Sequence, residues 1–133
     1  MKKKQKNNFK NRFFELVNVI TQVYTKEEKH KWVYFFAGFI FPTYDSFKFD
    51  EVKFINAVDF SNCIFNCRIE FLNMNISTLD IQHSTFIKRL YFNNVDFKFS
   101  LYANNATFYN GLSFINCSLQ KHLLFEHCTF SNK

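Results

Sequence analysis

Two consecutive copies of one pattern, ATFYNGLSFIN (residues 106–116) and CSLQKHLLFEH (residues 117–127), decide the fold of this chain. With x for any residue, the eleven-residue pattern is small-x-Phe-x-x-x-Leu-x-Phe-x-x, and it extends from Thr43 to Phe130. Ser84 is the only polar residue found in the four apolar slots of these repeats. Each repeat therefore has one apolar face to bury.

The spacing of the apolar slots is typical of short strands. Inward pairs two residues apart are separated by corners of two and then three residues, which does not fit the helical period of 3.6. A fixed period predicts a β-solenoid, in which each unit buries its apolar face against its neighbours. The chain has two glycines and one proline, so other residues must make the turns. Asn and His residues that accept positive φ precede the small slot, at Asn62, Asn73, His83, Asn94, Asn105, Asn116 and His127.

Three segments carry a family resemblance: AVDFSNCIF (57–65), NNVDFKF (93–99) and FEHCTF (125–130). They resemble pentapeptide-repeat proteins, and the alternation of five with six residues is similar to a variant found in many bacterial members. The resemblance implies a right-handed quadrilateral β-helix of about four coils, with 22 residues in each coil. It implies no common catalytic activity, because some members mimic DNA and protect topoisomerases whereas others are scaffolds.

In that geometry, residues one coil apart stack in columns that fill the interior. One expected column holds Phe65, Phe86, Phe108 and Phe130, and another holds Phe49, Phe71, Phe92 and Phe114. We expect no internal ligand cavity, so function must lie on the outer walls or at the ends. The pattern is imperfect at residues 32–41, where Trp32, Phe36 and Phe41 are expected to point inward and Gly38 does not fit.

Residues 1–31 form a separate basic segment before the solenoid at 32–133. Apolar residues at helical spacing predict a helix from about residue 8 to residue 24: Phe9, Phe13, Leu16, Val17, Ile20 and Val23. One role for this helix is to cover the first coil. The alternative is a peripheral contact with an anionic membrane or a partner, through Lys2, Lys3, Lys4, Lys6, Lys10, Arg12 and Phe13.

Charge is unevenly distributed along the chain. Residues 1–40 carry nine Lys or Arg against three Glu, whereas residues 41–133 carry eight of each sign. A neutral solenoid disfavours DNA mimicry of the kind that protects topoisomerases, and the basic segment lacks an aromatic platform for nucleic acid. The longest apolar run, residues 32–41, is too short to span a membrane. We expect a cytoplasmic protein, or one held peripherally at the inner membrane face.

The residue types that could bind a metal or take part in catalysis all fit structural roles. Cys63, Cys117 and Cys128 occupy inward slots as reduced thiols, and Cys67 is expected to point outward from a corner. No metal or cofactor site is expected, because the histidines are isolated and no CxxC spacing occurs. The carboxylates are scattered among basic residues over successive faces, so we expect no enzymatic activity.

The leading hypothesis is a non-enzymatic interaction or scaffold module. An uncovered coil after the last repeat would present unpaired strand edges and bare apolar side chains. We therefore expect end-to-end homodimerisation at that coil, through Leu119, Leu123, Phe125 and Phe130. The identity of any other protein partner is left open by the sequence.

Overall fold

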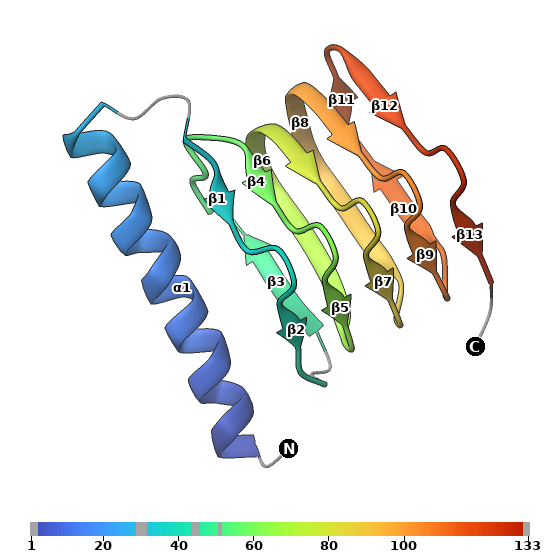
Figure 1. The fold of residues 1–133 in the computed structure, drawn as a ribbon, viewed down its shortest axis with the longest axis horizontal. Helices are drawn as coiled ribbons and strands as arrows, with labels where there is room; N and C mark the ends of the chain where they lie inside the picture. Colours follow the sequence, from blue (N-terminus) through green and yellow to red (C-terminus); the bar gives the residue numbers. More distant parts are fainter. Residues whose placement is uncertain (1–2, 29–31, 44–45, 51, 132–133) are drawn as a thin grey trace.

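The computed structural model describes residues 3–28, 32–43, 46–50 and 52–131, and it is a parallel β-solenoid with one N-terminal helix (Figure 1). The elements are α1 (Lys3–Lys26), β1 (Tyr34–Phe35), β2 (Ile40–Phe41), β3 (Ser46–Asp50), β4 (Val58–Asp59), β5 (Ile64–Phe65), β6 (Arg68–Asp80), β7 (Thr85–Phe86), β8 (Leu90–Tyr102), β9 (Thr107–Phe108), β10 (Leu112–Ile115), β11 (Ser118–Leu119), β12 (His122–Leu124) and β13 (Thr129–Phe130). Strands β2, β5, β7, β9 and β13 stack as one sheet, which marks about four coils along the rod. The solenoid expected from the repeat is confirmed.

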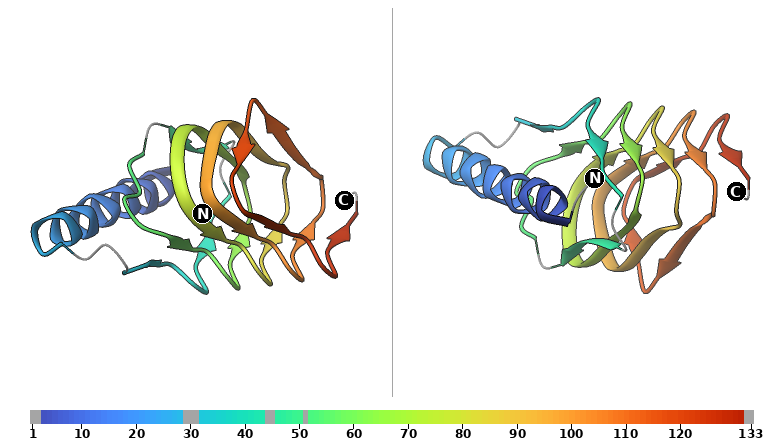
Figure 2. Two further views of the ribbon diagram at one scale, coloured as in Figure 1. Left: turned by 90° about the horizontal axis from the view of Figure 1, so that it is seen from above. Right: turned by 90° about the horizontal axis from the view of Figure 1, so that it is seen from below.

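Four straight segments make up each coil, and the strands of successive coils pair in parallel around it. Figure 2 shows the chain winding around the rod axis in this way. The long strands β6 and β8 each run over three of the four sides, and the sheet of β2, β5, β7, β9 and β13 forms the remaining side. The register shifts between Ile76 and Thr78, where the sequence lacks one residue of the repeat.

Stacked phenylalanines fill the interior in the two columns that the period predicted. The rings of Phe65 and Phe86 lie 4.6 Å apart between centroids, and those of Phe86 and Phe108 lie 5.3 Å apart. In the second column, Phe71 stacks on Phe49 at 4.8 Å and on Phe92 at 5.2 Å. Ser84, the polar exception, donates its hydroxyl to the Phe60 carbonyl and accepts from the Cys63 amide, so its burial leaves the hydroxyl satisfied.

The turns use the left-handed conformation at all seven positions that the sequence indicated. The backbone φ of these residues ranges from 51° at Asn116 to 61° at Asn105. Asn tolerates this region because its short polar side chain bonds locally. Asn94 adds a ladder bond, since its Nδ2 donates to Oδ1 of Asn73 in the preceding coil at 3.0 Å.

Replacing Asn94 by alanine is therefore expected to lower the free energy of unfolding by about 1 kcal/mol. Asn94→Gly keeps the positive φ of 58° and should lose much less, although it too removes the side-chain bond. Urea denaturation followed by circular dichroism measures both variants. Equal losses for the alanine and glycine variants would mean that the bond to Asn73, and not the backbone, sets the cost.

The first coil departs from the expected register. Trp32, expected to point inward, is 53% exposed, whereas Tyr34 is fully buried and pairs with Val58, 24 residues later. The expectation for Trp32 was wrong because this coil is two residues longer than the 22-residue repeat. Phe36 and Phe41 are buried as expected, and Gly38 adopts a φ of 80° in the corner between them.

Cys67 also differs from its expected position. It lies in the middle of a three-residue corner but is fully buried, and the equivalent Asn56 is 4% exposed. The side chain of the middle residue in each of these two corners turns toward the core. The alternation of inward and outward side chains along a strand therefore does not continue through the corner.

Candidate functional site

Helix α1 lies across the first coil and closes that end of the solenoid (Figure 1). Phe13 is 3% exposed, and its ring lies 4.8 Å from that of Phe36 and 5.3 Å from that of Phe41. Val17 is 1% exposed. The helix is longer than the sequence predicted, and its inner face also includes Phe14, which stacks on Phe47 at 5.4 Å. The apolar face of the helix is thus used to cover the coil.

Polar bonds fasten the far end of the helix. The hydroxyls of Thr21 and Tyr34 lie 2.6 Å apart, and the Tyr24 hydroxyl donates to the Val33 carbonyl at 2.8 Å. These bonds tie the helix to the residue that begins the first coil.

The residues expected to contact a membrane or partner through this helix fall into different environments. Phe13 lies in the core, so the membrane contact expected there does not fit its burial. Arg12 is exposed, and Nζ of Lys10 lies 5.8 Å from the Phe47 ring centroid. The other lysines are Lys3, Lys4 and Lys6, within the first two turns of α1, and Lys2, outside the described residues. No helix in the described part of the chain is long and apolar enough to span a membrane.

The last coil presents core-type side chains to the outside. Phe130 is 58% exposed, Leu123 47% and Leu119 37%, while Phe125 is partly buried. A shallow hollow of about 160 Å³ lies among Phe97, Leu101, Phe114, Cys117, Ser118, Leu119 and Leu123. The structure therefore brings the four residues of the expected dimer contact to one end of the rod, opposite α1.

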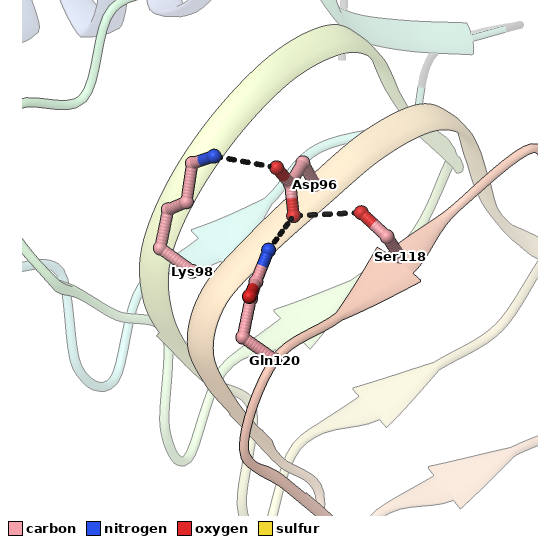
Figure 3. A network of polar contacts seen from close by, with 4 residues as sticks. All are labelled: Asp96, Lys98, Ser118 and Gln120. Atoms are coloured by element: carbon pink, nitrogen blue, oxygen red, sulfur yellow. Dashed lines mark hydrogen bonds and ion pairs between the residues drawn. The ribbon is translucent and has the colours of Figure 1, made fainter.

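A polar network on one side wall joins the third coil to the fourth (Figure 3). Asp96 accepts from Nζ of Lys98 at 2.7 Å, from Oγ of Ser118 at 2.7 Å and from Nε2 of Gln120 at 3.5 Å. The bond from Lys98, followed by that from Ser118, holds the pKa of this carboxyl below its usual value. A carboxylate stabilised in its charged form and engaged by three side chains fits a structural link between coils.

The cysteine side chains divide by depth. Cys63 and Cys67 are buried, whereas Cys117 and Cys128 are partly exposed in the last coil. Burial raises the pKa of the Cys63 thiol to about 11, and it also raises the pKa of Cys128. Because the thiolate is the nucleophile, Cys63 is shielded both by its position and by its protonation.

Iodoacetamide at pH 8 is expected to modify Cys117 and Cys128 in the folded protein, and Cys63 and Cys67 only after denaturation. Mass spectrometry of the digested protein measures each site. The same reaction in denaturant provides the control, because all four thiols then react. Modification of Cys63 in the folded protein at the rate seen in denaturant would contradict the burial of the inward slots.

Acidic and basic residues of the solenoid gather on opposite walls. The equal number of the two signs at residues 41–133 does not reveal this. The wall formed by β4, β12 and the last residues of β6 and β8 carries Asp59, Asp80 and Glu126, with no Lys or Arg at 58–62, 79–83, 101–105 or 123–127. Asp59 and Asp80 are register neighbours. We call these three residues the acidic wall.

The opposite wall, formed by β3, β10 and the first residues of β6 and β8, is basic together with the corner that precedes it. The basic residues of this wall and corner are Lys48, Arg68, Lys88 and Arg89, and Lys10 of α1 lies next to Phe47 of β3. We call these five residues the basic edge. Two acidic residues also lie within this wall: Glu70 is 8% exposed and paired with Arg68 at 3.2 Å, and Asp50, exposed at the end of β3, accepts a hydrogen bond from Nδ2 of Asn73 at 3.0 Å. Sequence reasoning missed the edge, although placing the charges on the 22-residue period would have revealed it.

Comparisons of the chain with known protein families, with curated proteins and with solved structures find no match. Among the described residues, no three His, Cys, Asp or Glu side chains gather where they could hold a metal ion. The surfaces that remain as candidates are the open last coil, the acidic wall and the basic edge.

Proposed function

We propose that the protein is a non-enzymatic interaction or scaffold module of the pentapeptide-repeat type, and that the last coil is its docking surface. The observation that carries this proposal is that, among the residues the structure describes, large inward-slot side chains are exposed in the last coil and buried in the coils before it. Phe86 and Phe108 are at most 1% exposed, whereas Phe130, next in their column, is 58% exposed. Apolar side chains exposed together at a strand edge are typical of a contact surface.

The occupant we propose is a second copy of the same coil. The strand edges of β10, β11, β12 and β13 offer backbone groups for pairing, and between residues 112 and 131 the charged residues are Lys121 and Glu126. Because these charges balance, two copies of this end can face each other without net repulsion. One side of a coil has about five or six residues, so the end face measures roughly 18 Å by 18 Å. This is well below the ~800 Å² per partner of a standard interface, so we expect a weak dimer of micromolar or lower affinity.

Sedimentation equilibrium over a range of concentrations tests this proposal. The unmodified chain is expected to dimerise, and Leu123→Glu to remain monomeric because it buries a charge at the contact. Val19→Glu is the matched control, since Val19 is 55% exposed on α1 at the other end of the rod. A monomer at all concentrations, or equal weakening by both substitutions, would overturn the proposed dimer.

The two other functions considered from the sequence are less well supported. Insertion of the apolar helix face into a membrane conflicts with the burial of Phe13 and Val17 against the solenoid. DNA mimicry requires a dense row of negative charge, and the acidic wall offers only Asp59, Asp80 and Glu126. A pull-down with gyrase would test the mimic directly, and we expect no retention.

A further inference from the structure

The basic residues of the solenoid lie at one corner of the rod and on the adjoining strand β3. Lys48 pairs in register with Glu70, and Arg68 is followed by Ile69, which pairs with Leu90. Arg89 therefore lies beside Arg68 in the next coil, and Lys88 precedes it in the same corner. The side chains of Lys48, Arg68, Lys88 and Arg89 are exposed.

The first turns of helix α1 lie at the same side of the molecule as the basic residues of the solenoid. They lie near the corner between β2 and β3, because Phe9 contacts Phe41 at 5.3 Å and Phe47 at 6.3 Å (Figure 1). The equivalent corners one and two coils further on, after β5 and β7 of the same sheet, carry Arg68 and then Lys88 and Arg89. The lysine-rich start of the helix and the basic residues of the solenoid thus share one edge of the molecule.

Contacts with neighbouring residues hold both arginines of the basic edge in position. The guanidinium carbon of Arg68 lies 4.3 Å from the ring centroid of Tyr91, and Arg68 also pairs with Glu70. Arg89 donates from Nε to the Asn110 carbonyl at 3.0 Å and from Nη1 to Oγ of Ser113 at 3.3 Å. A guanidinium has five N–H donors, so each retains donors for an outside anion after these bonds. Little side-chain freedom is then lost on binding.

We propose that the basic edge is the contact of this protein with an anionic lipid bilayer, on which the rod lies lengthwise. The anionic lipid surface is flat and continuous, so basic residues on successive coils can face it at the same time. The ring of Tyr91 is covered by Arg68, so it does not serve as a stacking platform for single-stranded bases. The acidic wall lies opposite, and repulsion from anionic lipid turns it toward the solvent.

This contact is electrostatic and does not depend on the apolar face of α1 or on the open last coil. Each basic residue near an anionic membrane surface contributes on the order of 1 kcal/mol, and salt screens the attraction within about 10 Å. We therefore expect binding that requires anionic lipid and is reversed by salt. Dimerisation and membrane binding are separable, because Leu123 and the basic edge lie on different parts of the rod.

Co-sedimentation of the full chain with phosphatidylcholine vesicles, with and without phosphatidylglycerol, tests the proposal. The double substitution Lys48→Glu/Lys88→Glu is expected to weaken binding to anionic vesicles at least tenfold. Lys26→Glu/Lys53→Glu makes the same change of net charge on exposed lysines away from both the edge and the last coil, and should change binding less than threefold. Lys48→Gln/Lys88→Gln repeats the test with smaller perturbation, and circular dichroism confirms folding of each variant.

Three outcomes would overturn the inference. One is the absence of binding to phosphatidylglycerol vesicles at low salt, and another is equal weakening by the two charge-reversed pairs, which would mean that net charge alone governs binding. The third is displacement from the vesicles by duplex DNA or RNA at concentrations far below those of lipid, with the same sensitivity to Lys48 and Lys88, because the edge would then bind nucleic acid.

Discussion

Replacing Phe13 by alanine is expected to lower the free energy of unfolding by about 3–5 kcal/mol. The ring contacts Phe36, Phe41, Phe47, Phe49 and Phe60 at centroid distances between 4.8 and 6.1 Å. Its removal leaves a cavity between the helix and the first coil, which is already the least regular part of the solenoid. Urea denaturation monitored by circular dichroism measures the loss.

Val19→Ala is the matched control for Phe13→Ala. It truncates a side chain on the same helix that is 55% exposed, and we expect a change within about 0.5 kcal/mol. Unchanged stability of Phe13→Ala would show that α1 leaves the solenoid in solution. Its apolar face would then be available to a membrane, as in the alternative considered from the sequence.

The second large effect is expected at Phe86, in the middle of a stacked column. Phe86→Ala should cost about 3–5 kcal/mol, because the ring is 1% exposed between Phe65 and Phe108. Phe130→Ala removes the same side chain from the same column but should cost less than about 1 kcal/mol in the monomer, since Phe130 is 58% exposed. The difference between the two variants isolates the effect of position along the rod.

Thermal and urea unfolding at low protein concentration measure this difference. Coils of a solenoid interact mainly with their neighbours, so a cavity in a middle coil disrupts contacts on both sides. Comparable losses for Phe86→Ala and Phe130→Ala would contradict an exposed last coil. If the cost of Phe130→Ala rises with protein concentration, the dimer proposed at that end gains direct support.

The repeat allowed much of the solenoid to be predicted from single residues. Phe65 and Phe86 stack because a fixed period places the same slot at the same point of each coil, and Asn94 turns the chain because few other residues accept its φ of 58° at low cost. Prediction failed where the repeat is interrupted. Trp32 lies in a lengthened coil, and Cys67 in a corner where strand alternation does not apply.

The candidate sites depended more on the assembled structure. The four apolar residues of the last coil were identified in advance from their slots in the repeat, and Leu119, Leu123 and Phe130 are exposed there. Phe13 was placed among the residues for membrane contact, since an amphipathic stripe suits either a core or a lipid surface. Only its contacts with the first coil distinguish the two, and they favour the core.

By itself, the sequence determined the solenoid, its aromatic columns and its asparagine turns, because these follow from local periodicity. The tertiary structure decided which face α1 covers and where the charges lie in space. Lys48, Arg68 and Lys88 are about 20 residues apart along the chain, within a region of zero net charge. Winding brings them onto one edge and leaves Asp59 and Asp80 on the opposite wall, so a neutral segment becomes a rod with a basic and an acidic side.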